Sequence, residues 1–105
     1  MATLTPRPRR GERRLYHVTH RHLRASIARA GLCPSCARGS PRVWLAARQR
    51  VAWAMSHVAE SHGWKITDLI VIVVIVPRSW MHRARRMVYW TEFHVPAVRL
   101  SLPVA

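Results

Sequence analysis

Acidic residues are scarce in this chain, with only four among its 105 residues. Against them stand 18 basic residues, which leave a formal net charge of +14. Lysine is almost absent too, because Lys65 is the only one and the other 17 basic residues are arginines. The planar guanidinium of arginine donates paired hydrogen bonds to phosphate. So uncompensated a charge favours a polyanionic partner, with RNA or DNA preferred and an anionic membrane surface as a weaker alternative.

Long apolar segments are missing as well. The longest run, Leu69 to Val76, has eight residues, whereas a membrane-spanning helix needs about 20. No apolar stretch follows the basic N-terminus, so we expect no secretory signal and a cytoplasmic setting. The run is mostly β-branched, does not alternate with polar residues and ends at Pro77. It predicts a central strand with both faces covered.

Cysteine occurs only twice, as Cys33 and Cys36 in a lone C-P-S-C. A single CxxC is weak evidence for zinc, although the seven histidines could complete a site, and thioredoxin-like redox chemistry is a further alternative. Pro34 and Ser35 are ordinary turn residues, which favours a plain loop. We therefore predict no bound metal.

The remaining pattern predicts one small α+β domain. Residues Met1 to Arg14 have the composition of a basic disordered arm, and the folded domain is expected over 15–105. The predicted elements are strands at 15–18, 42–45, 69–76, 87–91 and, on a sheet edge, 93–100, with two main helices at 20–30 and 46–62. This order predicts short strands in a mixed sheet. Trp44, Trp53 and Trp64 lie near the second helix, where we expect them to supply core area.

Four motifs, in order, resemble ADP-ribosyltransferase-fold proteins, which include the RNA 2′-phosphotransferases and the bacterial DNA ADP-ribosylating toxins. They are L-Y-H-V-T-H-x-x-L-x-x-S-I-x-x-x-G-L at 15–32, V-W-L at 43–45, the apolar strand ending in V-P at 68–77, and T-E-F-H-V-P at 91–96. The similarity spans about 15–100. It implies a split sheet with an NAD-binding cleft between its two parts.

The resemblance also implies roles for particular residues. His17 would hold a ribose hydroxyl of NAD, and Glu92 would stabilise the ribosyl oxocarbenium as nicotinamide leaves, so these two are the candidate catalytic residues. Trp44 would supply the aromatic contact of the middle motif. The candidate residues for binding NAD, as a substrate, are Tyr16, His17, Thr19, Trp44 and Tyr89.

Arginine clusters indicate where a nucleic acid would bind. The candidates are Arg7, Arg9, Arg10, Arg13, Arg14, Arg21, Arg24, Arg78, Arg83, Arg85 and Arg86. Two functions follow from the sequence. One is NAD-dependent ADP-ribosyl, or related 2′-phosphate, transfer acting on nucleic acid. The other is a non-catalytic basic protein with a degenerate version of the fold, which acts as a nucleic-acid-binding or assembly protein. Whether His17 and Glu92 converge on one cleft should distinguish them.

Overall fold

The apolar run forms strand β3, Leu69–Pro77, as predicted. A computed structural model describes residues 7–36 and 41–103 of the chain. Its other strands are β1 (Glu12–His20), β2 (Val43–Ala46), β4 (His82–Arg85), β5 (Val88–Thr91) and β6 (Leu100–Ser101). Its helices are α1 (Arg24–Ala30) and α2 (Val51–His62), each preceded by a short 3-10 turn. The α+β class and the two helices are confirmed.

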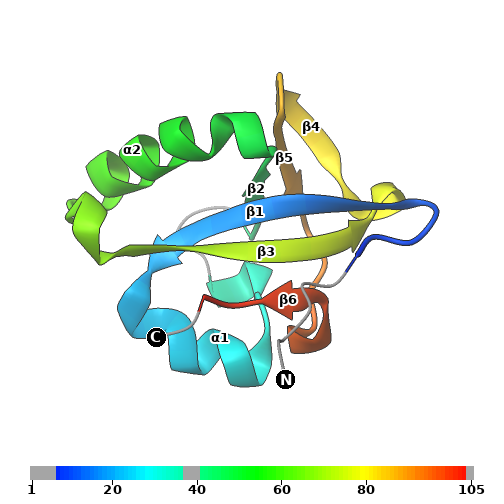
Figure 1. Ribbon diagram of the computed structural model, residues 1–105, viewed down its shortest axis with the longest axis horizontal. Coiled ribbons are helices and arrows are strands. Elements are labelled where there is room, and N and C mark those ends of the chain that lie inside the picture. Colours follow the sequence, from blue (N-terminus) through cyan, green and yellow to red (C-terminus); the bar gives the residue numbers. More distant parts are fainter. Residues whose placement is uncertain (1–6, 37–40, 104–105) are drawn as a thin grey trace.

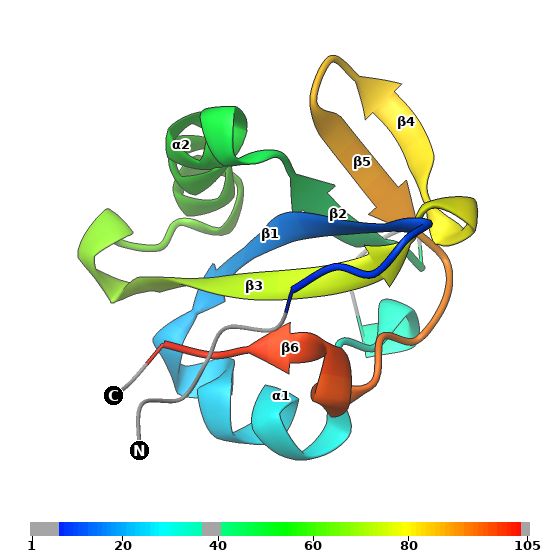
Figure 2. The ribbon, with the colours of Figure 1, turned by 45° about the vertical axis from the view of Figure 1, so that its right-hand side comes forward.

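The six strands form one sheet in the order β4-β5-β2-β1-β3-β6 (Figure 1). Strands β1 and β3 pair over nine residues, whereas β1 and β2 share a single pair, Tyr16 with Ala46. The sheet is therefore continuous but nearly divided at this point, and Figure 2 shows β2, β5 and β4 turning away from the β1–β3 pair.

The prediction of a mixed sheet is wrong, because every pairing between the strands of the described chain is antiparallel. Strands β2 and β3, which α2 connects, do run in the same direction, as a helical crossover requires. They are not neighbours, however, since β1 lies between them and is antiparallel to both. The order of elements along the chain does not show that β1 lies between β2 and β3.

The folded domain begins earlier than expected, because β1 starts at Glu12 rather than Leu15. Arg13 and Arg14 pair with Val76 and Ile75, so part of the predicted arm belongs to the sheet. The Glu12 carboxylate accepts hydrogen bonds from the Arg9 backbone N–H at 2.9 Å and from Arg99 Nη1 at 2.6 Å. These bonds fix the start of β1. Residues 1–6 of the predicted arm lie outside the described chain.

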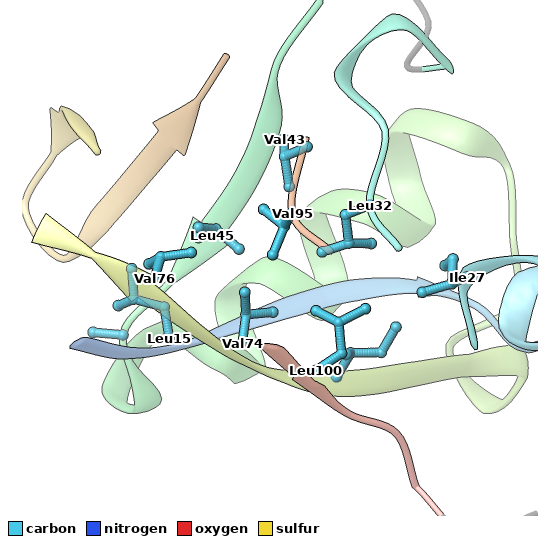
Figure 3. Packing of buried hydrophobic residues seen from close by; sticks show 11 residues of the cluster. Leu15, Ile27, Leu32, Val43, Leu45, Val74, Val76, Val95 and Leu100 are labelled. Atoms are coloured by element: carbon cyan, nitrogen blue, oxygen red, sulfur yellow. The ribbon is translucent and has the colours of Figure 1, made fainter. Parts of the chain in front are cut away.

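The main core lies on one face of the sheet (Figure 3). Leu15, Ile72, Val74 and Val76 are fully buried there, because side chains alternate between faces along β1 and β3. The same cluster is completed by Leu45, Val95, Leu100 and, from α1, Ile27.

The opposite face of the sheet carries a second apolar layer. Val18, Leu69 and Val88 are buried there but do not belong to the main core. Helix α2 packs on β1 and β3, on the side away from α1 in Figures 1 and 2. Both faces of β3 are thus covered, as predicted. No residue of α2 is fully buried, which leaves much of its surface accessible.

The predicted edge strand at 93–100 is much shorter than expected. Only Leu100–Ser101 forms β6, which does lie at the edge of the sheet. Pro96 has no N–H to donate to a ladder, and Val95 instead exchanges backbone hydrogen bonds with Leu32.

Candidate nucleic-acid interface

Tryptophan and arginine side chains gather on the face of the sheet that α2 partly covers. In β2, Val43 and Leu45 point into the main core, so Trp44 between them points to the other face. Trp44 is paired directly with Trp90 of β5, and Trp90 in turn with His82 of β4. Directly opposed residues share a face, so these three rings form a row across three strands.

Trp90 contacts an arginine and a histidine side chain. The guanidinium carbon of Arg42 is 4.0 Å from the centre of the Trp90 ring. The His82 ring stacks on the same indole at 4.2 Å, with 22° between the two planes. The first contact holds Arg42 beside the row, and the second keeps His82 and Trp90 in contact within it.

Trp53 of α2 extends this surface from the sheet to the helix. The guanidinium carbons of Arg50 and Arg85 lie 4.7 and 5.4 Å from its ring centre, and His57 stacks on it at 5.0 Å. Arg85 belongs to β4, so it spans from the β4–β5 hairpin to α2. We call this set the arginine–tryptophan surface: Arg42, Trp44, Arg50, Trp53, Arg85 and Trp90.

The expectation that tryptophans fill the core is wrong for this chain. Trp44 is 45% exposed, and Trp53 and Trp64 are only partly buried. The main core is instead built from aliphatic residues. Cation–π and stacking contacts with arginine and histidine, which the aliphatic core cannot offer, hold Trp53 and Trp64 nearer the surface.

His17 is fixed by a backbone contact between the two parts of the sheet. Its Nδ1–H donates a hydrogen bond to the Trp44 carbonyl oxygen over 2.8 Å. Desolvation by the surrounding protein lowers the pKa of His17, and this hydrogen bond offsets part of the shift. The imidazole is therefore neutral near pH 7, with Nε2 as the acceptor nitrogen.

Glu92 lies away from His17. Its side chain is exposed, and its Oε1 is 3.6 Å from Nε2 of His82, on the side of the sheet that carries Trp90. His17 is paired directly with the core residue Ile72 and so belongs to the opposite face. The structure does not bring the two candidate catalytic residues together.

The other candidate NAD contacts are also divided between the faces. Tyr16 and Trp44 share the face that carries the arginine–tryptophan surface, whereas Thr19 is buried on the face of His17. Tyr89 points toward the main core, and its hydroxyl accepts a hydrogen bond from Arg13 Nη1 at 2.6 Å.

The predicted nucleic-acid arginines fall into separate groups. Arg78, Arg83, Arg85 and Arg86 are exposed at and around β4, and Arg7, Arg9 and Arg10 are exposed before β1. Three others make contacts within the protein. Arg13 donates a hydrogen bond to the Tyr89 hydroxyl, and Arg24 donates one to the Pro103 carbonyl. Arg21 forms an ion pair with Asp68 at 3.2 Å. Arg14, in β1, is partly buried.

Two arginines of the surface, Arg42 and Arg50, are absent from the predicted set. Both could have been found from spacing. Arg42 is two residues before Trp44, so the two share a side if the strand extends to residue 42. Arg50 is three residues before Trp53, one helical turn away.

Within residues 7–36 and 41–103, no group of three or more histidine, cysteine, aspartate or glutamate side chains is arranged to hold a metal ion. Pro34–Cys36 forms a 3-10 turn within the predicted loop, and the side chain of Cys36 lies outside the described part. The expected absence of zinc stays a prediction.

None of the helices in the described ranges has the length and apolar character needed to cross a bilayer. Comparison with protein-family models, with curated proteins and with solved structures finds no match to this chain.

Proposed function

We propose that this protein binds nucleic acid through the arginine–tryptophan surface. The observation that supports this most directly is that Arg42, Arg50 and Arg85 are held over indole rings on one face of the molecule. An arginine stacked on a ring keeps its outward N–H groups available for phosphate oxygens. Indole faces beside them can contact bases or sugars.

The charge balance supports the same function. Four acids can neutralise at most four of the 18 basic side chains. Two of these acids, Glu12 and Asp68, are already paired with Arg99 and Arg21, away from the arginine–tryptophan surface. The other two acids are Glu60 of α2 and Glu92, which lies beside His82. In the described ranges neither forms an ion pair with an arginine of this surface, so its positive charge is available to an external polyanion.

The test is the salt dependence of binding to a labelled oligonucleotide, measured by fluorescence anisotropy. The double variant Arg85→Gln/Arg86→Gln removes two charges at the β4–β5 hairpin, and Arg29→Gln/Lys65→Gln removes two exposed charges elsewhere. We expect log Kd to depend on log[salt] less steeply in the hairpin variant, by roughly 1.4 in slope for two lost contacts to a single strand. The control pair should keep nearly the full slope.

Equal losses in the two variants would show that the charge acts without a defined surface. Absence of binding by the wild type at low salt would overturn the proposed function itself.

NAD-dependent transfer to nucleic acid remains a second candidate. The observation in its favour is that His17 is held neutral with Nε2 as an acceptor, which is the state needed to hold a ribose hydroxyl. Nicotinamide release from NAD, with and without RNA or DNA, tests it directly. Because Glu92 and His17 lie on opposite faces, Glu92→Gln should leave any release unchanged, whereas His17→Ala should weaken the apparent NAD affinity.

A further inference from the structure

Trp44 is more exposed than the other four tryptophans, which are all partly buried. Trp53, Trp64, Trp80 and Trp90 each have at least two ring or guanidinium contacts. In residues 7–36 and 41–103, no aromatic ring or guanidinium lies over Trp44, and this residue is 45% exposed. A single exposed ring is common on protein surfaces, but this one belongs to the row with Trp90 and His82 and has Arg42 nearby. It is therefore part of a larger aromatic and basic surface.

The position of Trp44 is rigid. It lies in β2 between β5 and β1, and its backbone carbonyl accepts the hydrogen bond from His17. Leu45, the next residue, is 1% exposed and fixes the strand in the core. A ring held this way loses little conformational freedom when it binds a flat partner.

The surroundings of Trp44 select the partner. The guanidinium carbon of Arg42 lies 4.0 Å from the ring centre of Trp90, the cross-strand neighbour of Trp44. A positive charge is therefore close to the exposed ring of Trp44. A partner must therefore combine a flat apolar group with adjacent negative charge. A second copy of this chain would bring the same net charge of +14 and is disfavoured by repulsion.

We propose that Trp44 is a stacking site for an unpaired base, so that the ligand is single-stranded nucleic acid. The proposal rests on the proposed function and narrows it. In a duplex the base faces are covered by neighbouring bases, whereas a single strand exposes them to aromatic side chains. Arg42 then contacts the phosphate beside the stacked base, and Arg50 and Arg85 contact the strand where it passes Trp53.

The main comparison is between an intact and an abasic single strand, which carry the same number of phosphates. The probes are single strands of RNA and of DNA about 12 nucleotides long, the DNA duplex, and a DNA strand whose central positions are abasic. We expect the wild type to bind the intact single strands roughly tenfold more tightly than the abasic strand, the scale of one stacked base. The RNA and DNA arms show which sugar is preferred.

Substitution then assigns the effect to Trp44. Trp44→Ala should bind the intact and abasic strands equally and should keep the wild-type affinity for the abasic strand and the duplex. Trp44→Phe, which keeps a smaller ring, should retain part of the preference. Trp64→Phe is the control at a ring covered by three histidines and should leave the preference unchanged. The melting temperature of each variant checks that it is folded.

The outcomes separate the two proposals. If the wild type binds intact and abasic strands equally, or prefers the duplex, stacking at Trp44 is overturned while nucleic-acid binding stands. If it binds none of the probes at low salt, the proposed function falls as well. A preference for intact strands that survives in folded Trp44→Ala would also overturn the assignment to this residue.

Discussion

At the scale of single residues, Gly31 is the least able to accept a side chain of the three glycines in the described ranges. Its φ is +77°, and a Cβ there would lie 2.1 Å from the Val95 carbonyl oxygen and 3.0 Å from the Ala97 nitrogen. The same backbone carries the Leu32–Val95 bridge. We expect Gly31→Ala to reduce the free energy of unfolding by about 3 kcal/mol or more, because backbone strain adds to a backbone clash.

Gly63 is the matched control in a denaturant titration. Its φ is +67°, and within the described ranges no atom beyond its chain neighbours lies within 4 Å of the position that a Cβ would occupy. Gly63→Ala should therefore reduce the free energy of unfolding by only about 1 kcal/mol, the strain of alanine in the left-handed conformation. Equal losses at the two glycines would contradict the packing of Gly31 against Val95.

His17 predicts a pH dependence of stability. Its pKa is lowered by burial in the folded protein, whereas in the unfolded chain it is near 6.5. Between these two values the unfolded state binds more protons, so this contribution to stability is complete above pH 6.5 and is lost as the pH falls through that window.

The measurement is the melting temperature at pH 7.5 and at pH 5.5. The wild type should lose more stability over this interval than His17→Asn, whose side-chain amide can still donate to the Trp44 carbonyl but does not titrate. An identical loss in both proteins would contradict the burial of a neutral His17.

At the scale of elements, the start of β1 predicts the effect of truncation. Deleting residues 1–10 keeps the hydrogen bond from the Arg78 N–H to the Gly11 carbonyl and all nine pairs of β1 with β3. Deleting residues 1–14 removes three of those pairs and the Glu12–Arg99 ion pair.

We expect the shorter deletion to melt close to the wild type and the longer one to melt roughly 5 to 10 °C lower in calorimetry. Glu12→Gln in the full chain separates the ion pair from the strand pairing. If both truncations melt together, residues 12–14 contribute little to the sheet.

The elements differ in how well the sequence predicts them. Strand β3 could be predicted because an eight-residue apolar run that is mostly β-branched and ends at Pro77 strongly favours a strand. Strand β1 was predicted too short because Arg13 and Arg14 have the composition of an arm, and only the length of β3 draws them into pairing. The α+β class follows from element order, whereas the insertion of β1 between β2 and β3 depends on tertiary contacts.

The candidate site was less predictable than the fold. Arg85 was found as part of a charge cluster, but its contact with Trp53 joins a hairpin to a helix more than 30 positions away in the chain. The separation of His17 from Glu92 depends on the register of β1 with β3 and of β4 with β5. Residue patterns alone do not carry that register.

At the scale of the whole molecule, the chain has a net charge of +14, and the structure has principal extents of 37 × 35 × 26 Å. At 0.01 M ionic strength the screening length is about 30 Å, so charges repel one another across almost the whole protein. At 0.15 M it is about 8 Å, and only near neighbours interact. The stability of the folded state should therefore depend on the salt concentration.

Salt should consequently act in opposite directions on stability and on binding. Raising sodium chloride from about 0.01 to 0.15 M should raise the melting temperature of the free protein, because screening relieves self-repulsion in the folded state. The same change should weaken binding to nucleic acid, since each counterion released from the nucleic acid gains less entropy in a more concentrated salt solution. A melting temperature that is constant or falls with salt would show that repulsion between the charges does not destabilise the folded protein.

A bound polyanion should replace salt in this role. At 0.01 M ionic strength a saturating single strand should raise the melting temperature, because a ligand that binds the folded state stabilises it by mass action. The increase should shrink as salt is added and affinity falls. Sodium sulfate at matched ionic strength is the control: if it stabilises far more than chloride, bound anions rather than general screening compensate the arginines.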